Sequence, residues 1–189
     1  MIVVSGGSGF IGSAIRKHLW PALNYDTADP ESLGNLNKKY DAFIDCSWPA
    51  KPSDQFKTWN TVIDHFKRQQ GGKMILFSSI YGHKTPDFGM YAGTEIQAKP
   101  IEYAMLKAAT EQATRYLAQK LKPYNVQVNC VAPGGVVNKE SEKFQQAYFE
   151  SGSANMIQTK NLLPIIDALL HEDNAINGQI ITVDGGWAL

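Results

Sequence analysis

The sequence predicts an α/β fold in which helices cover both faces of a doubly wound, mostly parallel sheet. Short apolar runs rich in Val and Ile alternate with helical segments along the chain, and a glycine-rich loop follows the first run. Parallel strands need helical crossovers, so this alternation is typical of a sheet covered on both faces. The length of 189 residues favours one domain, residues 1–189, around one core.

The amino-acid composition limits the classes of partner that the protein is expected to bind. Lys plus Arg and Asp plus Glu both number 18, so no excess charge points to nucleic acid or to an anionic membrane. No apolar run approaches the length of a membrane span, and the first begins directly after Met1, leaving no room for a signal segment. Cys46 and Cys130 lie in apolar runs and are expected to be free thiols of a reducing compartment. We therefore expect a cytoplasmic protein that binds a small molecule, without a metal.

The glycine-rich loop predicts a nucleotide site. Residues 1–5 are expected to form a short buried strand and residues 13–19 a helix. Between them, Gly6, Gly9 and Gly12 have the GxxGxxG spacing, which lets the backbone approach a pyrophosphate at the helix N-terminus. This context predicts a Rossmann-like dinucleotide site. The expected loop contacts are Gly6, Ser8, Gly9, Phe10, Ile11 and Gly12.

The second strand should supply an acid. It is expected within residues 23–29, where a carboxylate usually binds the adenosine ribose hydroxyls. Asp26 is the candidate and Asp29 the fallback, although Asp26 is closer to Gly12 than the roughly 20 residues typical of the motif. Because a carboxylate disfavours a 2′-phosphate, the sequence favours NAD as cofactor, and NADP is not excluded.

The chain is short between the second and fourth strands of such a fold. Residues 40–47 are predicted as the next strand, and the segment before them has room for one short helix. A full doubly wound half needs a helix, a strand and a second helix there, so we expect the edge strand and helix to be reduced or missing. The turn formed by Cys46, Ser47 and Trp48 is expected to lie along the cofactor.

Polar residues follow the next strand. Residues 53–70 are predicted as a helix with Ser53 as its N-cap, and residues 73–79 as a strand that ends on Ser78 and Ser79. Hydroxyls at the carboxyl end of a central strand face the ligand crevice of open α/β sheets. The long aromatic-rich loop over residues 80–100 is expected to contact the substrate.

Tyr103 and Lys107 are the strongest catalytic candidates. They lie four residues apart in a predicted helix over residues 101–121, so they share a face. A nearby ammonium favours the phenolate, which should lower the pKa of Tyr103 from about 10 and make it a useful acid or base. The outer face of the helix carries Ala109, Ala113, Tyr116 and Lys120.

The remaining elements complete the alternation. We expect strands over residues 125–131 and 176–187, a lid over residues 139–152 and a helix over residues 161–171.

In their order along the chain, these motifs resemble the short-chain dehydrogenase/reductase family. They are the glycine loop, Ser78-Ser79, Tyr103-x-x-x-Lys107, the Asn129–Gly135 segment and the Gly178–Trp187 segment. Residues 78–103 are similar to members associated with bacterial surface-sugar and flagellin-glycan pathways. The glycine spacing resembles that of extended members that act on nucleotide sugars.

The resemblance implies roles for individual residues. Tyr103 would be the general acid/base, Lys107 would lower its pKa and bind the nicotinamide ribose, and Ser79 would hold the substrate oxygen, with Ser78 ranked second. Asn60 is assigned to the family's proton relay by position alone. The backbone of Pro133, Gly134 and Val136 would face the nicotinamide carboxamide. The resemblance also implies that the outer face of the helix over residues 101–121 pairs into a homodimer or homotetramer.

One departure from the family concerns the turn after the third predicted strand. The family's Asn-Asn-Ala-Gly turn is replaced here by Asp45-Cys-Ser-Trp48.

The function predicted first is an NAD(P)-dependent oxidoreductase that interconverts a carbonyl and a secondary alcohol on a sugar or nucleotide sugar. An epimerase or dehydratase of the same family and a non-catalytic NAD-binding scaffold or sensor remain alternatives.

Overall fold

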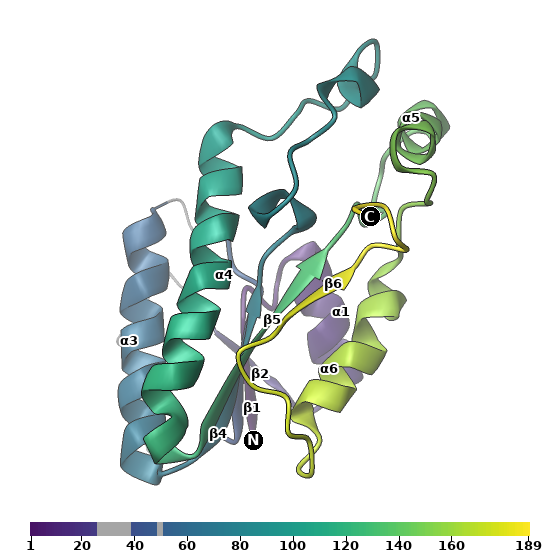
Figure 1. The fold of residues 1–189 in the computed structure, drawn as a ribbon. Helices are drawn as coiled ribbons and strands as arrows, with labels where there is room; N and C mark the ends of the chain where they lie inside the picture. The colour runs from purple at the N-terminus through teal and green to yellow at the C-terminus, as the bar shows by residue number, and fades with distance from the viewer. Residues whose placement is uncertain (26–38, 49–50) are drawn as a thin grey trace.

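A single six-stranded parallel sheet organises the chain (Figure 1). The structure is a computed structural model that describes residues 1–25, 39–48 and 51–189, so Asp26 and Asp29 lie outside the described residues. The strand order is β2-β1-β3-β4-β5-β6, and every neighbouring pair is parallel. The strands are β1 (Ile2–Ser5), β2 (Leu23–Tyr25), β3 (Ala42–Asp45), β4 (Gly72–Phe77), β5 (Val126–Pro133) and β6 (Ile180–Val183).

Helices flank the sheet on both sides. In Figure 1, α3 and α4 cover one face while α1 and α6 cover the other, and α5 stands apart beyond the carboxyl ends of the strands. The helices are α1 (Phe10–His18), α3 (Pro52–Gln69), α4 (Ile101–Leu121), α5 (Glu142–Gly152) and α6 (Leu163–Leu170). Short 3₁₀ turns are η1 (Ile80–Gly82), η2 (Phe88–Tyr91), η3 (Lys122–Tyr124) and η4 (Thr159–Leu162). The predicted α/β, doubly wound fold is confirmed.

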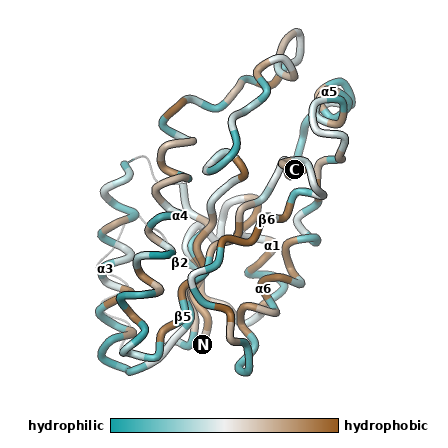
Figure 2. Tube along the Cα trace, viewed as in Figure 1, coloured by the Kyte–Doolittle hydropathy of each residue, from teal (hydrophilic) through white to brown (hydrophobic). Residues whose placement is uncertain are grey.

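Two apolar layers hold the helices to the sheet. Successive side chains of a strand point to opposite faces, so Phe43 packs in the layer under α3 and α4 while Ile44 packs in the layer under α1 and α6. Both are fully buried. Strands covered on both faces are expected to be apolar throughout, and the central strands are the most hydrophobic part of the trace in Figure 2.

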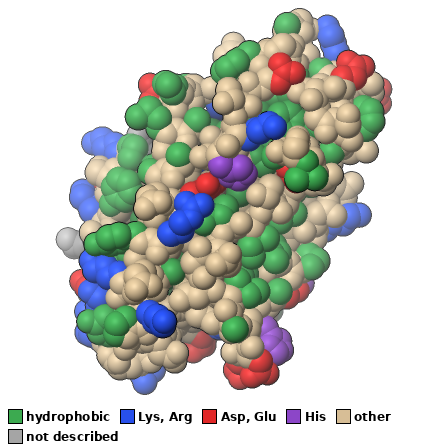
Figure 3. Space-filling view, viewed as in Figure 1, with side chains coloured by type: hydrophobic (Ala, Val, Ile, Leu, Met, Phe, Trp, Pro, Cys, Tyr) green, Lys and Arg blue, Asp and Glu red, His purple; other side chains and the backbone are tan. Residues whose placement is uncertain are grey.

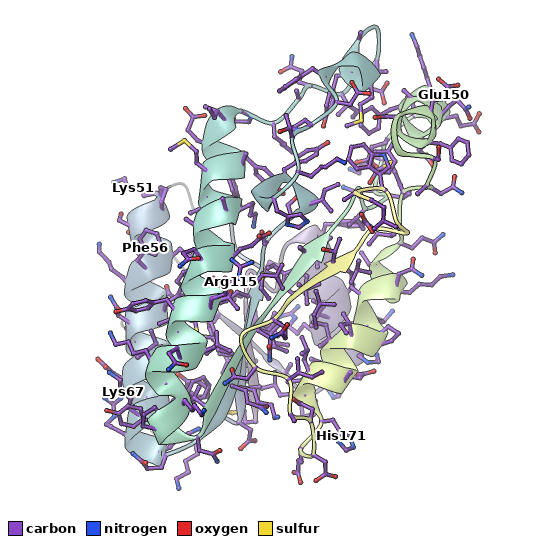
Figure 4. All side chains as sticks on the ribbon, viewed as in Figure 1. Lys51, Phe56, Lys67, Arg115, Glu150 and His171 are labelled. Carbon is purple, nitrogen blue, oxygen red and sulfur yellow. The ribbon has the colours of Figure 1, made fainter. Side chains whose placement is uncertain are left out.

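The topology places a ligand crevice between β1 and β3. The chain passes from β1 outward to β2 and then returns to β3 on the other side of β1, so the strand order reverses at that point. Open α/β sheets bind ligands outside the carboxyl ends of the strands at such a reversal. Glu150 of α5 lies at this end of the molecule and His171, after α6, at the opposite end (Figure 4).

Element boundaries differ from those predicted in two informative places. Helix α3 begins at Pro52 after the extended residue Lys51, with no side-chain N-cap, so the expected Ser53 cap is wrong. Pro52 replaces it because its fixed φ suits the first helical turn and its missing N–H needs no partner there. The last strand contains only Ile180–Val183, since Gly185 and Gly186 have φ of +70° and +89° and turn the chain.

Among the described ranges, β2 and β6 are the two edge strands of the sheet. No helix in these ranges combines the length and the apolar character needed to cross a membrane.

Candidate active site

A cavity of about 440 Å³ opens at the carboxyl ends of the strands. It extends from the start of α1, past the turn after β3, to the end of β4, the first turn of α4 and the segment after β5. Eleven of the predicted cofactor-binding and catalytic residues line it: Phe10, Ile11, Cys46, Ser47, Trp48, Ser79, Tyr103, Lys107, Pro133, Gly134 and Val136.

The cavity reaches Phe10 and Ile11 at the start of α1, whereas Gly6, Ser8, Gly9 and Gly12 of the glycine loop are not among its lining residues. The loop requires glycine at two positions. Gly6 has φ +69°, and a Cβ there would lie 2.8 Å from the Ser47 backbone. A Cβ on Gly12 would lie 2.3 Å from the Gly6 carbonyl oxygen. The loop is therefore tightly packed between β1, α1 and the turn after β3, with backbone rather than side chains at the N-terminus of α1. Such a backbone surface fits the pyrophosphate of a dinucleotide.

Ser8 has a partner within the protein. Its hydroxyl accepts a hydrogen bond from Asn24 Nδ2 at 2.9 Å, and the Ser8 side chain is exposed at the edge of the sheet. Asn24 thus connects the glycine loop to β2, the strand that precedes the predicted ribose-binding segment in the sequence. The ribose-binding prediction for Asp26 itself falls outside the described residues.

The structure brings Ser79, Tyr103 and Lys107 together. Helix α4 begins at Ile101, so Tyr103 lies in its first turn and Lys107 one turn later on the same face. Ser79, two residues after β4, lies beside the Tyr103 phenol and lowers the pKa of that phenol. Lys107 is 6% exposed, and its Nζ donates to the Phe77 carbonyl oxygen at 2.8 Å.

The pKa of Tyr103 departs from the sequence prediction. Burial raises this pKa above its ordinary value, and the hydrogen bond from Ser79 lowers it only in part. The expected lowering by Lys107 is absent because the ammonium is directed toward Phe77 and lies 5.7 Å from the centre of the Tyr103 ring. Burial likewise lowers the pKa of Lys107, and the nearby Asp45 carboxylate opposes that shift.

Trp48 covers the Tyr103–Lys107 pair. Its ring centre lies 4.9 Å from that of Tyr103, and Lys107 Nζ lies 5.7 Å from it. Trp48 is also 53% exposed, so one part of the indole faces the outside of the cavity.

Asp45 is a site residue whose role sequence reasoning missed. Its buried carboxylate accepts hydrogen bonds from the Ser47 backbone at 3.0 Å, the Ser47 hydroxyl at 2.5 Å, Gln55 Nε2 at 2.9 Å and Trp59 Nε1 at 2.6 Å. Four donors of this kind compensate the desolvation of a carboxylate. The sequence did contain one indication of this role, because Asp45 places a carboxylate where the family's turn has the amide of an asparagine.

Asn60 does not reach the site, which corrects the relay prediction. It is exposed on α3 and does not line the cavity, whereas Gln55, Thr58 and Trp59 occupy the buried face. Asn60 is separated from this buried stripe by the helical rotation of 100° per residue. The sequence position of Asn60 alone does not determine on which side of α3 its side chain lies.

The two serines after β4 have different surroundings. The Ser78 hydroxyl donates toward α4, to the Lys107 carbonyl and Glu111 Oε1, each at 3.0 Å. Ser79 instead accepts a hydrogen bond from the Tyr81 amide at 3.2 Å, beside the Tyr103 phenol. This arrangement favours Ser79 over Ser78 as the residue that meets a substrate oxygen.

Aromatic residues of the long loop and of α5 line the other half of the cavity. The Tyr81 and Tyr91 hydroxyls lie 2.7 Å apart, and the Tyr91 ring packs against Phe144 of α5. The Tyr148 hydroxyl accepts a hydrogen bond from the Gly135 amide at 2.9 Å. Glu95 ties the loop to α5 by accepting from the Ser141 backbone at 2.9 Å and from its hydroxyl at 2.7 Å.

The arrangement supplies an acid, a cation and a hydroxyl beside a backbone-lined nucleotide groove. Within the described ranges, no three His, Cys, Asp or Glu side chains are grouped so that they could hold a metal ion. The phenol, the ammonium and the hydroxyl at the cavity could transfer a proton to or from an oxygen atom beside a dinucleotide.

Comparison with known proteins gives three informative matches. Residues 56–188 match the family model described as enoyl-(acyl carrier protein) reductase. The chain is 31% identical over 185 residues to post-translational flagellin modification protein A of Campylobacter coli, covering 96% of this chain and 67% of that protein. It is 30% identical over 136 residues to D-xylose 1-dehydrogenase of Caulobacter vibrioides, covering 67% of this chain and 49% of that protein.

A solved structure matches the whole fold. The short-chain dehydrogenase of Leptospira borgpetersenii with bound NAD+ superimposes with a TM-score of 0.86 at 23% identity, covering 100% of this chain and 92% of that one. The chain spans between about half and two thirds of the length of the curated relatives named above.

Proposed function

The chain belongs to the short-chain dehydrogenase/reductase family, and we propose that it is an NAD(P)-dependent oxidoreductase that interconverts a carbonyl and a secondary alcohol. One observation carries the proposal: Ser79, Tyr103 and Lys107 meet in a single cavity that extends to Phe10 and Ile11, at the start of the helix that follows the glycine loop. A scaffold that only bound a nucleotide would have no need for a buried cation beside a phenol and a hydroxyl.

The cofactor would lie along the groove that starts at the glycine loop. The backbone of Gly6–Gly12 would hold its pyrophosphate, the turn formed by Cys46, Ser47 and Trp48 would flank it, and Pro133–Val136 would face the nicotinamide. Asp26, the residue that follows Tyr25 in the sequence, is the proposed basis of a preference for NAD over NADP.

Each catalytic residue would have one task. The bound nicotinamide supplies or accepts the hydride. The Ser79 hydroxyl binds the substrate oxygen, and Tyr103 gives that oxygen a proton during reduction and removes it during oxidation. The buried Lys107 ammonium, which donates to the Phe77 carbonyl oxygen, would bind the nicotinamide ribose. The raised pKa of Tyr103 keeps the phenol protonated at neutral pH, which suits the reductive direction.

The substrate is proposed to be a sugar or a nucleotide sugar. The half of the cavity away from the glycine loop combines aromatic faces with the paired Tyr81 and Tyr91 hydroxyls, a surface suited to a hydroxyl-rich ring. One relative supports the same class by name, the D-xylose 1-dehydrogenase.

The test is NADH absorbance during turnover with a panel of sugars and nucleotide sugars. Tyr103→Phe should lower kcat by about 10²-fold or more, since general acid catalysis contributes about 10²–10⁴-fold. NADH affinity should change little, because the ring is kept. Binding of NAD without any absorbance change across the panel would contradict the oxidoreductase proposal. Product analysis by NMR would then test for an epimerase or dehydratase.

We further propose a homodimer or homotetramer that pairs through α4. The exposed side of this helix carries Ile101, Met105 and Tyr116, which are 72%, 64% and 61% exposed. Phe56 of the neighbouring α3 is also exposed (Figure 4), and apolar side chains recur over both helices in Figure 3. Such apolar exposure is typical of interaction surfaces. Sedimentation equilibrium should give two or four chain masses, and a single-chain mass would remove this proposal.

A cytoplasmic location is part of the proposal. Cys46 and Cys130 are both free, as expected of a reducing compartment.

A further inference from the structure

Helix α4 carries a buried acid in line with Tyr103 and Lys107. Glu111 follows Lys107 by one turn, so the three side chains share one helix face. Glu111 is 4% exposed, and the mechanism above gives it no task. A buried carboxylate costs several kcal/mol in desolvation unless hydrogen bonds compensate it, so its contacts identify what it serves.

Glu111 binds the segment that follows β4. Its Oε1 accepts from the Ser78 hydroxyl at 3.0 Å and lies 2.7 Å from His83 Nδ1. These two residues stand on either side of the η1 turn, which begins directly after Ser79. Glu111 therefore holds both ends of that turn from the helix that also carries Tyr103.

Gly82 permits this close approach. A Cβ at Gly82 would lie 2.6 Å from Glu111 Oε1, 2.7 Å from Ser78 Oγ and 3.0 Å from the Lys107 carbonyl carbon. The turn is thus packed directly onto the carboxylate and onto the backbone of α4, with no space for a side chain between them.

The η1 turn also holds Ser79 in position. The Tyr81 amide donates to Ser79 Oγ at 3.2 Å, and the Gly82 amide donates to the Ser79 carbonyl at 2.8 Å. Movement of the η1 turn away from α4 would move the Ser79 hydroxyl relative to the Tyr103 phenol. Catalytic groups need to be held within about 0.5 Å of their productive geometry.

We propose that Glu111 is a positioning residue: through Ser78 and His83 it clamps the η1 turn to α4 and thereby sets the distance between the Ser79 hydroxyl and the Tyr103 phenol. This inference rests on the proposed function, because it assigns Glu111 to the same site. In this proposal, α4 carries Tyr103 and Lys107 directly and also positions the Ser79 hydroxyl through Glu111.

Steady-state kinetics test the clamp. Glu111→Ala should lower kcat by about 10-fold to 10²-fold, because small displacements of catalytic groups have effects of that size. The NADH Kd, measured by fluorescence, should change less than about twofold, since Glu111 lies away from the glycine loop. Glu111→Gln keeps an acceptor oxygen at the same place and should restore most of kcat. Glu102→Gln, an exposed acid in the first turn of the same helix, is the matched control.

A double-mutant cycle separates positioning from general stability. In a Ser79→Ala background, Glu111→Ala should cause no further loss of kcat beyond about twofold, because the residue it positions is already absent. Additive losses would overturn the proposal, since they would mean that Glu111 acts independently of Ser79. His83→Ala removes one half of the clamp at a partly exposed site and should lower kcat less than Glu111→Ala, so folding failure of one variant leaves the other informative.

Hydrogen exchange tests the clamp without turnover. The amides of Tyr81, Gly82, His83 and Lys84 are all hydrogen-bonded within the turn. Glu111→Ala should accelerate exchange of a peptide covering residues 80–84 by about 10-fold or more relative to wild type and to Glu102→Gln. If the exchange rate of this peptide were unchanged in Glu111→Ala, the proposed positioning role of Glu111 would be overturned, whatever the effect on kcat. An inactive wild-type enzyme would instead count against the proposed function, while exchange would still decide the clamp.

Discussion

At the residue scale, Asp45 illustrates how a buried charge tunes a neighbour. The carboxylate is 1% exposed, and its electrostatic interaction with Lys107 raises the pKa of that lysine against the lowering by burial. Four hydrogen-bond donors hold Asp45 in place. The family's amide at this point of the turn would give the same shape without the charge.

Asp45→Asn should therefore alter the pH dependence of catalysis. Loss of the carboxylate removes the interaction that raises the pKa of Lys107, so the lysine should lose its proton at lower pH. The alkaline limb of kcat for reduction should move toward neutral pH in the variant. The free energy of unfolding should also fall by about 2 kcal/mol, the range for hydrogen bonds to a charged group. An alkaline limb at the wild-type pH would contradict the proposed link between Asp45 and Lys107.

At the scale of elements, the glycine loop is fixed by backbone contacts rather than by side chains. Gly12 at the start of α1 faces the Gly6 carbonyl, and a Cβ there would also lie 2.9 Å from the Gly6 carbonyl carbon. Because these are backbone atoms, they cannot move aside as a flexible side chain would. The close contact sets how α1 points its N-terminus toward the groove.

Gly12→Ala should weaken cofactor binding. Making room for the Cβ must displace the loop from the N-terminus of α1, so the NADH Kd should rise by about 10-fold or more. Fluorescence titration measures the change, and Ser13→Ala in the same helix serves as the control. If Gly12→Ala bound NADH as tightly as wild type, the loop would not be the pyrophosphate site.

Sequence patterns predicted the elements better than their contacts. Apolar runs and the glycine spacing predicted the parallel sheet and the loop, and the four-residue spacing placed Tyr103 and Lys107 on one face of α4. The pKa of Tyr103 was predicted in the wrong direction because it depends on burial and on where the Lys107 ammonium points. The Asp45 contacts were not predictable, since Gln55 and Trp59 come 10 and 14 residues later and their orientation depends on the rotation of α3.

Contacts between residues far apart in the sequence were also not predictable from the sequence. Ser141 and Glu95 are 46 residues apart, and nothing in their local sequences predicts that they meet. The lid over residues 139–152 was expected from its polar, amphipathic pattern, and α5 forms over Glu142–Gly152. Its docking onto the aromatic loop through Tyr91 and Phe144 became visible only with the tertiary structure.

At the scale of the whole molecule, buried phenols link stability to alkaline pH. Burial raises the pKa of Tyr40, Tyr81, Tyr91, Tyr103 and Tyr148, the last to about 12. A tyrosine in the unfolded chain has a pKa of about 10, so the unfolded state releases these protons first as pH rises. The stability associated with these residues is therefore complete below about pH 10 and is lost above it.

Tyr40→Phe tests this linkage at one position. Tyr40 is fully buried, and its hydroxyl has no hydrogen-bond partner among the residues that the structure describes. Removing an unpaired buried hydroxyl should leave the free energy of unfolding at pH 7 unchanged or slightly higher. Above pH 10, the variant should lose stability less steeply than wild type, by about 1.4 kcal/mol per pH unit for the one proton removed. Urea denaturation across pH 7–11 measures both effects, with Tyr124→Phe at a partly exposed position outside the proposed α4 interface as the control. Equal alkaline slopes for Tyr40→Phe and wild type would mean that the buried Tyr40 phenol does not titrate with unfolding.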